Sequence, residues 1–373
     1  MNRSNLEMEL SWARRHMPLV QQALSAMPDL SGIRIAFSIH LDLKIIILIE
    51  GLLQRGASCF LLTCNPTTVR DEVVEYLVSR GAEARAWSGM SQSDFQAAIQ
   101  AALNWNPTHL CEFGADLTYA IHTGRESMPA IQASLEGTGS GIARLGDMTP
   151  LYPIFNWDDL PVKEGLHNRH MVGITTWQTF FDRTHLTLHG KRVAVIGYGL
   201  VGQGVAATAR AFGGSVTIVE IDPVRALQAA YDGWHVLPIE SALQQADVVA
   251  TAAGAAGVVN RAHLPYLRDG MFLVNIGHRS DEIDVPWLYA YPHRQVMPFI
   301  EEVDLDGGRI YLFAGGSMAN LTAGYGDSLN AFDTTLSLMT AGIKFTAGEG
   351  QNYSPGVYIL PQESWLPFIT QQD

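Results

Sequence analysis

Short apolar runs alternate with amphipathic stretches along the first 150 residues. The run "IRIAFSIH" at 33–40 is mostly apolar and ends in polar residues, which is typical of a buried strand in a parallel sheet. A helical pattern follows at about 42–55. Further strands are predicted at "SCFLLTC", "EARAW" and "THLCEF", and further helices in "TTVRDEVVEYLVSRG" and near 92–104. This alternation indicates βαβ units, so we predict one doubly wound domain here.

The second half of the chain repeats the alternation and adds a glycine-rich turn. "KRVAVIGYG" predicts a strand that enters the turn, "LVGQGVAATARAFGG" predicts the helix after it, and "SVTIVEID" predicts the next strand. The runs "DVVATAAG", "MFLVNIGH" and "RIYLFAGG" predict more βα units. The predicted fold class is therefore α/β, with two doubly wound, Rossmann-like domains.

The turn "GYGLVG" has the spacing of a dinucleotide-binding site. Gly197 permits the tight turn, Gly199 lets the backbone approach a pyrophosphate, and Gly202 allows close helix packing. Glu220 ends the second strand, where an acid binds the ribose 2′-hydroxyl and repels a 2′-phosphate. The sequence therefore predicts NAD, rather than NADP, as the cofactor. The alternative is a glycine-rich packing turn that binds no ligand.

Other strand ends indicate where ligands bind, because ligands of parallel sheets lie beyond the carboxyl ends of the strands. His40 and Phe113 end two strands of the first domain. In the second domain, strand ends at Gly254 and at Asn275–His278 are expected to surround the nicotinamide.

Composition and charge exclude several other classes. The chain has 373 residues, a net charge of −13 and only three cysteines, without a C-x-x-C pair. Acidic charge argues against a nucleic-acid partner, and the cysteine count argues against a disulfide framework or a cysteine-rich metal site. No apolar run reaches the length of a membrane span, and the first residues lack the apolar core of a signal peptide. We expect a soluble, cytoplasmic protein without a metal.

Several motifs resemble the S-adenosylhomocysteine hydrolase family. They include "GKRVAVIGYGLVGQG", "VEIDPVRALQAAYDGW", "VNIGHRSDEIDVPWL" and "MANLTAGYGDS", and in the first half "SIH", "CN", "ADLTYAIHT" and "KEGLHN". The resemblance covers nearly the whole chain in order. It implies a substrate domain over 1–170, completed by about 328–360. It also implies an inserted NAD-binding domain over 171–327 and a short tail over 361–373.

The resemblance also implies a reaction. In this family, tightly bound NAD takes a hydride from C3′ of a ribose, and the resulting ketone makes the C4′ proton acidic. Loss of that proton expels the group at C5′, water adds to the alkene, and the hydride returns. NAD is recycled in each turnover, so it serves as a prosthetic group.

Five residues match the family's catalytic positions. His40 is expected beside the leaving group, Lys163 at the 3′-hydroxyl proton and His278 beside the ribose. Asn168 matches an asparagine after that lysine, and His167 stands just before it. Judged without the resemblance, a lone histidine at a strand end is more often structural, and the lysine could be a solvated surface residue.

Further positions match the family's cofactor contacts. Asn320 matches an asparagine near the nicotinamide carboxamide, and Thr138 and Ser140 stand where the family has threonines that touch NAD. Besides the glycines and Glu220, the predicted NAD contacts are Thr138, Ser140, Leu200, Val201, Ile221, Asn275, Ile276, Gly277 and Asn320.

The sequence departs from the family around the sugar of the substrate. The family's catalytic aspartate falls on Phe113, and its second aspartate falls on His167. The family's "EETTTG" becomes "EGTGSG" here. Its sugar-binding glutamate is therefore replaced by Gly137 or, with a shift of one residue, retained as Glu136.

Departures also occur where the family binds the base and the neighbouring subunit. Asp42 and Lys44 replace a threonine and a glutamate that read adenine, and Asp327 replaces a histidine. The basic tail with K-x-x-x-Y, which reaches a neighbour's NAD, is missing. We therefore expect a homo-oligomer in which a dimer is favoured over the family's usual tetramer.

Because these departures gather around the substrate while the NAD motif is intact, we favour an NAD-dependent enzyme with an altered nucleoside substrate. Its product could be a hydrolysed thioether or an alkene retained after loss of water. Three alternatives stay open: S-adenosylhomocysteine as the substrate, a catalytically silent NAD-binding regulator, and a simple two-substrate dehydrogenase.

Overall fold

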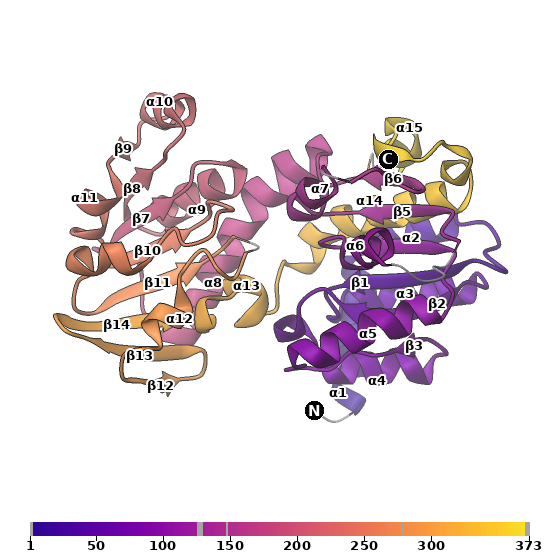
Figure 1. The fold of residues 1–373 in the computed structure, drawn as a ribbon, viewed down its shortest axis with the longest axis horizontal. Helices are drawn as coiled ribbons and strands as arrows, with labels where there is room; N and C mark the ends of the chain where they lie inside the picture. The colour runs from indigo at the N-terminus through magenta and orange to yellow at the C-terminus, as the bar shows by residue number, and fades with distance from the viewer. Residues whose placement is uncertain (1–2, 125–129, 147, 278, 370–373) are drawn as a thin grey trace. The chain divides into compact units, whose positions relative to one another are not determined.

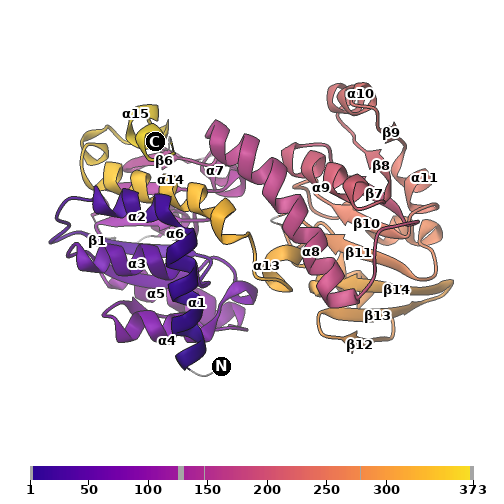
Figure 2. The ribbon, with the colours of Figure 1, turned by 180° about the vertical axis from the view of Figure 1, so that it is seen from behind.

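A computed structural model describes residues 3–124, 130–146, 148–277 and 279–369 of the chain. It divides into two compact units (Figures 1 and 2). Unit 1 comprises residues 1–163 and 329–373, and unit 2 comprises residues 164–328. Unit 2 is thus an insertion into the sequence of unit 1. Among the described helices, none is long and apolar enough to cross a membrane.

Unit 1 contains a seven-stranded sheet in the order β15-β6-β5-β4-β1-β2-β3, and every neighbouring pair is parallel. Its strands are β1 (Arg34–Ile39), β2 (Ser58–Thr63), β3 (Glu83–Ala84), β4 (His109–Glu112), β5 (Ala133–Glu136), β6 (Pro153–Asn156) and β15 (Gly356–Ile359). Its helices are α1 (Arg3–His16), α2 (Pro18–Ser25), α3 (Ile45–Gln54), α4 (Asp71–Ser79), α5 (Gln92–Asn104), α6 (Asp116–Thr123), α7 (Gly139–Leu145), α14 (Leu329–Ala347) and α15 (Gln362–Ile369), with short turns η1 (Pro66–Thr68) and η5 (Gly350–Asn352).

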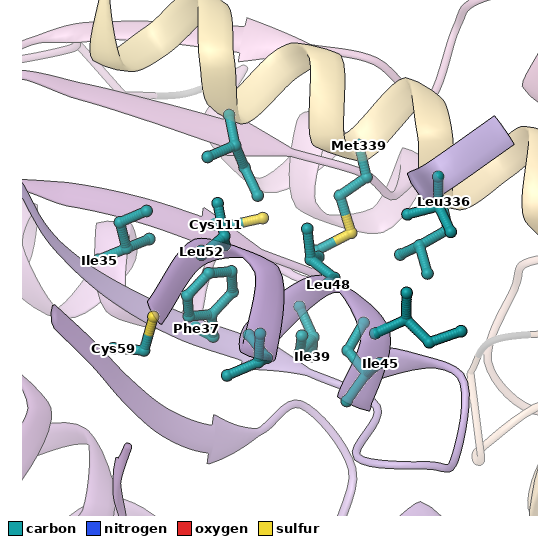
Figure 3. Packing of buried hydrophobic residues seen from close by; sticks show 14 of the residues in the cluster. Ile35, Phe37, Ile39, Ile45, Leu48, Leu52, Cys59, Cys111, Leu336 and Met339 are labelled. Atoms are coloured by element: carbon teal, nitrogen blue, oxygen red, sulfur yellow. The ribbon is translucent and has the colours of Figure 1, made fainter. Parts of the chain in front are cut away.

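The period-two alternation of β1 explains why helices cover both faces of this sheet. Ile35, Phe37 and Ile39 point to one face, where they pack with α1, α2, α3 and α14 (Figures 2 and 3). Ala36 points to the other face, which α5 and α6 cover (Figure 1). The continuous apolar run of β1 is therefore explained by burial on both faces of the sheet, as expected for a buried strand of a parallel sheet.

Unit 2 contains an eight-stranded sheet in the order β12-β13-β14-β11-β10-β7-β8-β9. Its strands are β7 (Arg192–Ile196), β8 (Ser215–Val219), β9 (His235–Val236), β10 (Val248–Thr251), β11 (Met271–Asn275), β12 (His293–Met297), β13 (Ile300–Leu305) and β14 (Gly308–Phe313). Its helices are α8 (Val172–Thr184), α9 (Leu200–Ala211), α10 (Pro223–Tyr231), α11 (Ile239–Leu243), α12 (Val285–Leu288) and α13 (Ala319–Thr322), with η3 (Arg261–Tyr266) and η4 (Ala314–Gly316).

The two faces of the unit 2 sheet are also both covered. Val193 and Val195 pack with α8 and α9, while Ala194 and Ile196 pack with α11 and α12. The two-sided burial confirms the predicted α/β class with two doubly wound sheets.

One edge of the unit 2 sheet differs from the prediction. The run "RIYLFAGG" forms β14, which pairs parallel with β11 but antiparallel with β13. Leu305 pairs with Gly308, so Asp306 and Gly307 form the loop of a hairpin. Asp-Gly is a strong hairpin signal, and it outweighs the βα reading of this segment.

Two segments of unit 1 also differ from the prediction. α4 begins at Asp71 rather than near residue 67, because Val69 adopts an extended conformation after the short η1 turn. Residues 362–369, which were expected to be a tail, form α15 instead. Its Trp365 and Phe368 are buried in the unit 1 core, so their apolar area accounts for the helix.

A nine-residue π-helix, η2 (Lys163–Met171), leads into α8 and contains the boundary between the units. Long π-helices are rare, and π geometry often occurs at functional sites. Within unit 2, α8 and α9 approach with backbone against backbone. A Cβ atom at Gly173 would lie 2.6 Å from the Gly204 carbonyl oxygen, and one at Gly204 would lie 1.7 Å from the Arg169 carbonyl oxygen.

We predict that Gly204→Ala lowers the free energy of unfolding by about 1–3 kcal/mol, because the added methyl group has no room beside the Arg169 carbonyl. Chemical denaturation monitored by circular dichroism measures the change. Gly165→Ala in η2 is the matched control, since nothing lies within 4 Å of its added Cβ. Equal stability of the two variants would contradict the close packing of α9 against the backbone of η2.

Candidate functional site

The turn between β7 and α9 has the geometry of a pyrophosphate site. Gly197 has a φ of +101°, and a Cβ there would lie 2.5 Å from the Ala252 carbonyl oxygen. A Cβ at Gly202 would lie 2.0 Å from the Gly197 carbonyl oxygen. Gly199 is the N-cap of α9, so Leu200 and Val201 open the helix at the predicted position. A side chain therefore has no room at Gly197 or Gly202, and the helix N-terminus attracts an anion.

Glu220 follows β8 beside the same turn. Its carboxylate accepts hydrogen bonds from the backbone N–H groups of Tyr198 at 2.7 Å, Ile221 at 2.8 Å and Asp222 at 2.9 Å. These bonds fix the carboxylate at the end of the strand, where a ribose hydroxyl is expected. The neighbouring Ile221 side chain is 95% exposed, so it offers apolar surface to an adenine ring.

Asn320 provides a second feature that fits NAD. It is buried, and its Nδ2 donates to the Thr175 hydroxyl at 3.3 Å. No donor among the described residues reaches its Oδ1. A buried acceptor without a partner costs about 1–3 kcal/mol, which an amide donor such as the nicotinamide carboxamide would recover.

The end of β11 is shaped by Asn275. Its Oδ1 accepts from the Thr251 hydroxyl at 3.0 Å, and its Nδ2 donates to the carbonyls of Arg279 and Gly316. These bonds hold the loop that carries the predicted cofactor contacts Ile276 and Gly277. The predicted catalytic residue His278 lies outside the described residues.

His167 and Asp327 are brought together within unit 2, although they are far apart in the sequence. Nε2 of His167 lies 3.2 Å from Oδ2 of Asp327, and both side chains are at most 10% exposed. Oδ1 of Asp327 lies 3.4 Å from the Thr175 hydroxyl. Sequence reasoning identified both residues as departures from the family but did not pair them. Asn168, next in η2, is half-buried.

In unit 1, His40 lies at the carboxyl end of β1 as predicted. Its Nδ1 is 2.8 Å from the Thr68 hydroxyl and 3.5 Å from Sγ of Cys64. Thr68 follows β2, so the two neighbouring strand ends together orient the imidazole ring.

Phe113 lies beside His40 and replaces polar chemistry with an apolar surface. Its ring is 5.7 Å from the His40 ring and 6.0 Å from the Trp157 ring, measured between centroids. A Cβ at Gly137 would lie 2.6 Å from Phe113 and 2.7 Å from Trp157. A glutamate at position 137 therefore has no room. Sequence reasoning missed Trp157, which carries no motif of its own.

Glu136 is a buried acceptor rather than an exposed sugar-binding group in this structure. It accepts from the N–H groups of Gly114, Ala115 and Thr138, and from the Thr138 hydroxyl. Burial raises its pKa to about 8, and the carboxylate of Glu112 on the neighbouring strand adds to this effect. Burial likewise raises the pKa of Glu112 to about 7.

The residues that align with the family's run of threonines, Thr138 and Ser140, lie at the N-terminal cap of a helix. Thr138 is the N-cap of α7, where its hydroxyl accepts from the Gly141 N–H, and Ser140 lies 3.2 Å from that hydroxyl. Both predicted NAD contacts therefore lie at the start of one short helix of unit 1.

Two lysines at the predicted substrate positions form ion pairs within unit 1. Nζ of Lys163 contacts the Asp158 carboxylate. Nζ of Lys44 lies 2.5 Å from the Asp42 carboxylate and 5.4 Å from the centre of the Phe332 ring. Lys44 is almost fully buried, so its ammonium group depends on these neighbours.

Three features occur together: the glycine-rich turn before α9, the Glu220 carboxylate held at the end of β8, and the buried Oδ1 of Asn320 that has no donor among the described residues. They define a dinucleotide-binding protein of Rossmann type. The comparisons agree. The family model described as "S-adenosyl-L-homocysteine hydrolase" matches residues 4–143, and the one described as "S-adenosyl-L-homocysteine hydrolase, NAD binding domain" matches residues 178–326.

Full-length relatives match over nearly the whole chain. An S-inosyl-L-homocysteine hydrolase from Methanopyrus kandleri is 31% identical, covering 95% of this chain and 86% of the relative. An adenosylhomocysteinase from Aeropyrum pernix is 34% identical, covering 92% and 85%. Among solved structures, a dipicolinate synthase chain from Bacillus halodurans superimposes with a TM-score of 0.48 at 16% identity, covering 83% of this chain and 99% of that chain.

The chain belongs to the S-adenosyl-L-homocysteine hydrolase family. Its cofactor is NAD, as predicted, and it is an NAD-dependent enzyme of the adenosylhomocysteinase type.

The buried carboxylates of Glu112 and Glu136 predict a pH-dependent stability. Because both pKa values are raised in the folded state, the folded protein holds protons that the unfolded chain releases above about pH 4.5. The free energy of unfolding should therefore fall by on the order of 5 kcal/mol from about pH 5.5 to about pH 8.5, because the two folded-state pKa values lie about 1.5 and 2.5 units above the start of this range. Urea denaturation across this range measures the loss, and Glu136→Gln should reduce it. Stability that rises with pH in both proteins would contradict the prediction.

We predict that the protein purifies with NAD and that Glu220→Ala raises the Kd for NAD about 10- to 100-fold, because a ribose bond to a charged group is lost. Isothermal titration of NAD-stripped protein measures the Kd. Glu240→Ala, an exposed acid on α11, is the control and should bind as the unaltered protein does. The assignment fails if Glu220→Ala retains full affinity.

Proposed function

We propose that this chain oxidises the 3′-hydroxyl of a purine nucleoside whose base or leaving group differs from that of S-adenosylhomocysteine. The ketone then drives elimination and addition at the neighbouring carbons. NAD, when bound, takes the hydride from the ribose and later returns it. In this proposal Gly197, Gly199, Gly202 and Glu220 hold the dinucleotide, and Asn320 holds its carboxamide.

Three residues would act on the ribose and the leaving group. Lys163 would orient the 3′-hydroxyl, with its ammonium group supported by Asp158. His40 would serve at the leaving group, where Thr68 orients its ring. Asn168, in the same π-helix as Lys163, would contribute a further hydrogen bond.

The observation that carries the altered substrate is the buried Lys44–Asp42 pair beyond β1. An ammonium group only donates hydrogen bonds, and so does the 6-amino group of adenine, whereas a carbonyl at the same position accepts them. A lysine there therefore favours a 6-oxopurine such as hypoxanthine. The M. kandleri relative is named for S-inosyl-L-homocysteine, whose base carries that carbonyl.

The aromatic surface beside His40 supports a change at the sugar or leaving group as well. Phe113 and Trp157 fill the space next to Gly137, so a carboxylate side chain at position 137 has no room to bind the sugar. Whether the product is a hydrolysed thioether or an alkene depends on the leaving group, and the mass of the product distinguishes them. A homodimer stays a prediction of this proposal.

We predict that S-inosylhomocysteine is turned over at least about tenfold more efficiently than S-adenosylhomocysteine, which is the size of effect that one misplaced donor produces. The NAD-loaded protein would be mixed with both thioethers and with inosine and adenosine. The absorbance of reduced nicotinamide and the product masses would then be recorded.

Lys44→Gln should reduce this preference, because an amide can either donate or accept a hydrogen bond. Lys191→Gln, on a lysine that precedes β7, is the control and should keep it. Faster turnover of S-adenosylhomocysteine would overturn the altered base preference. NAD that no nucleoside reduces would favour a catalytically silent regulator.

A further inference from the structure

Glu282 is a fully buried acid in unit 2 that the proposed function does not use. Its two carboxylate oxygens accept hydrogen bonds from the backbone N–H groups of Ala253 at 3.0 Å and Gly254 at 2.7 Å. These two residues follow β10, whereas Glu282 itself lies in the segment that follows β11. Because β10 and β11 are parallel neighbours, the carboxylate joins the loops beyond two adjacent strand ends.

Backbone contacts on both sides fix the position of this carboxylate. A Cβ atom at Gly277 would lie 1.8 Å from Oε1 of Glu282, so the acid occupies the space that a side chain there would need. The N–H of Gly257 donates to the Asp281 carbonyl at 2.7 Å, and the N–H of Val259 donates to the Glu282 carbonyl at 3.0 Å. The acid is therefore held where the two loops meet.

The strand order indicates which half of a dinucleotide binds at these loops. The strands β9-β8-β7-β10-β11-β14 follow the order of a dinucleotide-binding sheet, in which the ligand spans the crevice where the order reverses, between β7 and β10. Glu220 at the end of β8 marks the adenosine half. The nicotinamide half is therefore expected over β10, β11 and β14, on the side where Asn320 follows β14 with its buried acceptor.

The charge of Glu282 is suited to a positive ligand. Its carboxylate is held by backbone N–H groups, while the nearby Arg279 forms its ion pair with Asp281 at 2.6 Å. Burial raises the pKa of Glu282, as expected for an acid whose charge is taken out of water. A positive charge nearby stabilises such a carboxylate. The oxidised nicotinamide ring carries a positive charge, whereas the reduced ring is neutral.

We propose that Glu282 makes the site selective for the oxidised form of the cofactor. Two unit charges about 10 Å apart, at an effective dielectric constant of about 20, change a binding constant on the order of tenfold. A preference for oxidised NAD lowers the reduction potential of the bound cofactor, so it favours return of the hydride at the end of turnover. This inference rests on NAD as the cofactor and goes beyond the proposed function, because it does not involve the nucleoside.

The test measures which form of the cofactor the full-length holoprotein holds. The protein is equilibrated with equal, saturating concentrations of oxidised NAD and NADH, unbound cofactor is removed, and the bound forms are released and quantified by mass spectrometry. Glu282→Gln removes the charge but keeps the size of the side chain and an acceptor oxygen. It should lower the bound ratio of NAD to NADH about tenfold, which corresponds to a midpoint potential higher by about 30 mV for a two-electron couple.

Two further variants separate a charge effect from a structural one. Glu282→Asp retains the charge, so it should keep the ratio even where it weakens total binding. Asp247→Asn removes an acid at the opposite end of β10, where Asp247 pairs with Arg192, and it should also keep the ratio. A purely structural role of Glu282 would lower the affinity for both forms together and leave the ratio unchanged.

A ratio in Glu282→Gln within about threefold of that in the unaltered protein would overturn the proposal, and so would an equal fall in Asp247→Asn. If Glu282→Gln does not fold, the unaltered protein decides. It should hold an excess of oxidised NAD, and an equal or larger amount of NADH would contradict the charge effect. These measurements contain no nucleoside, so a failure here leaves the proposed substrate standing, and a wrong substrate leaves this inference standing.

Discussion

Two buried carboxylates determine the backbone conformation of unit 1 at the carboxyl ends of β4 and β5, the edge of the sheet where a ligand is expected. Glu112 and Glu136 end neighbouring strands and accept hydrogen bonds from the backbone that follows β4. Gly114 and Ala115 in that backbone both have positive φ, which costs free energy at a residue with a side chain. The carboxylates offset this cost and thereby fix the direction in which Phe113 leaves the strand. The apolar surface beside His40 thus depends on two buried acids, of which the family motif alone would assign Glu136 to the sugar of the substrate.

Much of the fold was predictable because its signals are local. Between β7 and α9 the hydrophobic pattern changes from that of a strand to that of a helix at the same residues where the glycine-rich turn occurs. The two signals therefore predict the same boundary. β1 and α5 were equally clear from their apolar spacing. The hairpin of β13 and β14 was missed because the apolar pattern of a strand does not distinguish a parallel from an antiparallel neighbouring strand. The Asp306–Gly307 turn contained that information.

The candidate site was predicted residue by residue but not as an arrangement. His167 replaces an aspartate of the family and Asp327 replaces a histidine, and each substitution taken alone resembles the loss of a functional residue. Their contact shows that the two changes belong to one hydrogen-bonded pair. Likewise, the absence of a side chain at Gly137 is explained by Phe113 and Trp157, which come from other strand ends. Such complementarity is created by folding, and a single sequence contains no spacing rule that reveals it.

The backbone contact between α8 and α9 also couples the ends of unit 2 mechanically. With glycine at positions 173 and 204, the backbones of α8, α9 and η2 meet at these two points without an intervening side chain. η2 and α9 therefore touch through their backbones, at the helix whose N-terminus would face the pyrophosphate. Coupling free energies between sites are reciprocal, so any ligand that shifts η2 and thereby changes the affinity for the dinucleotide would have its own affinity changed by the dinucleotide by the same factor.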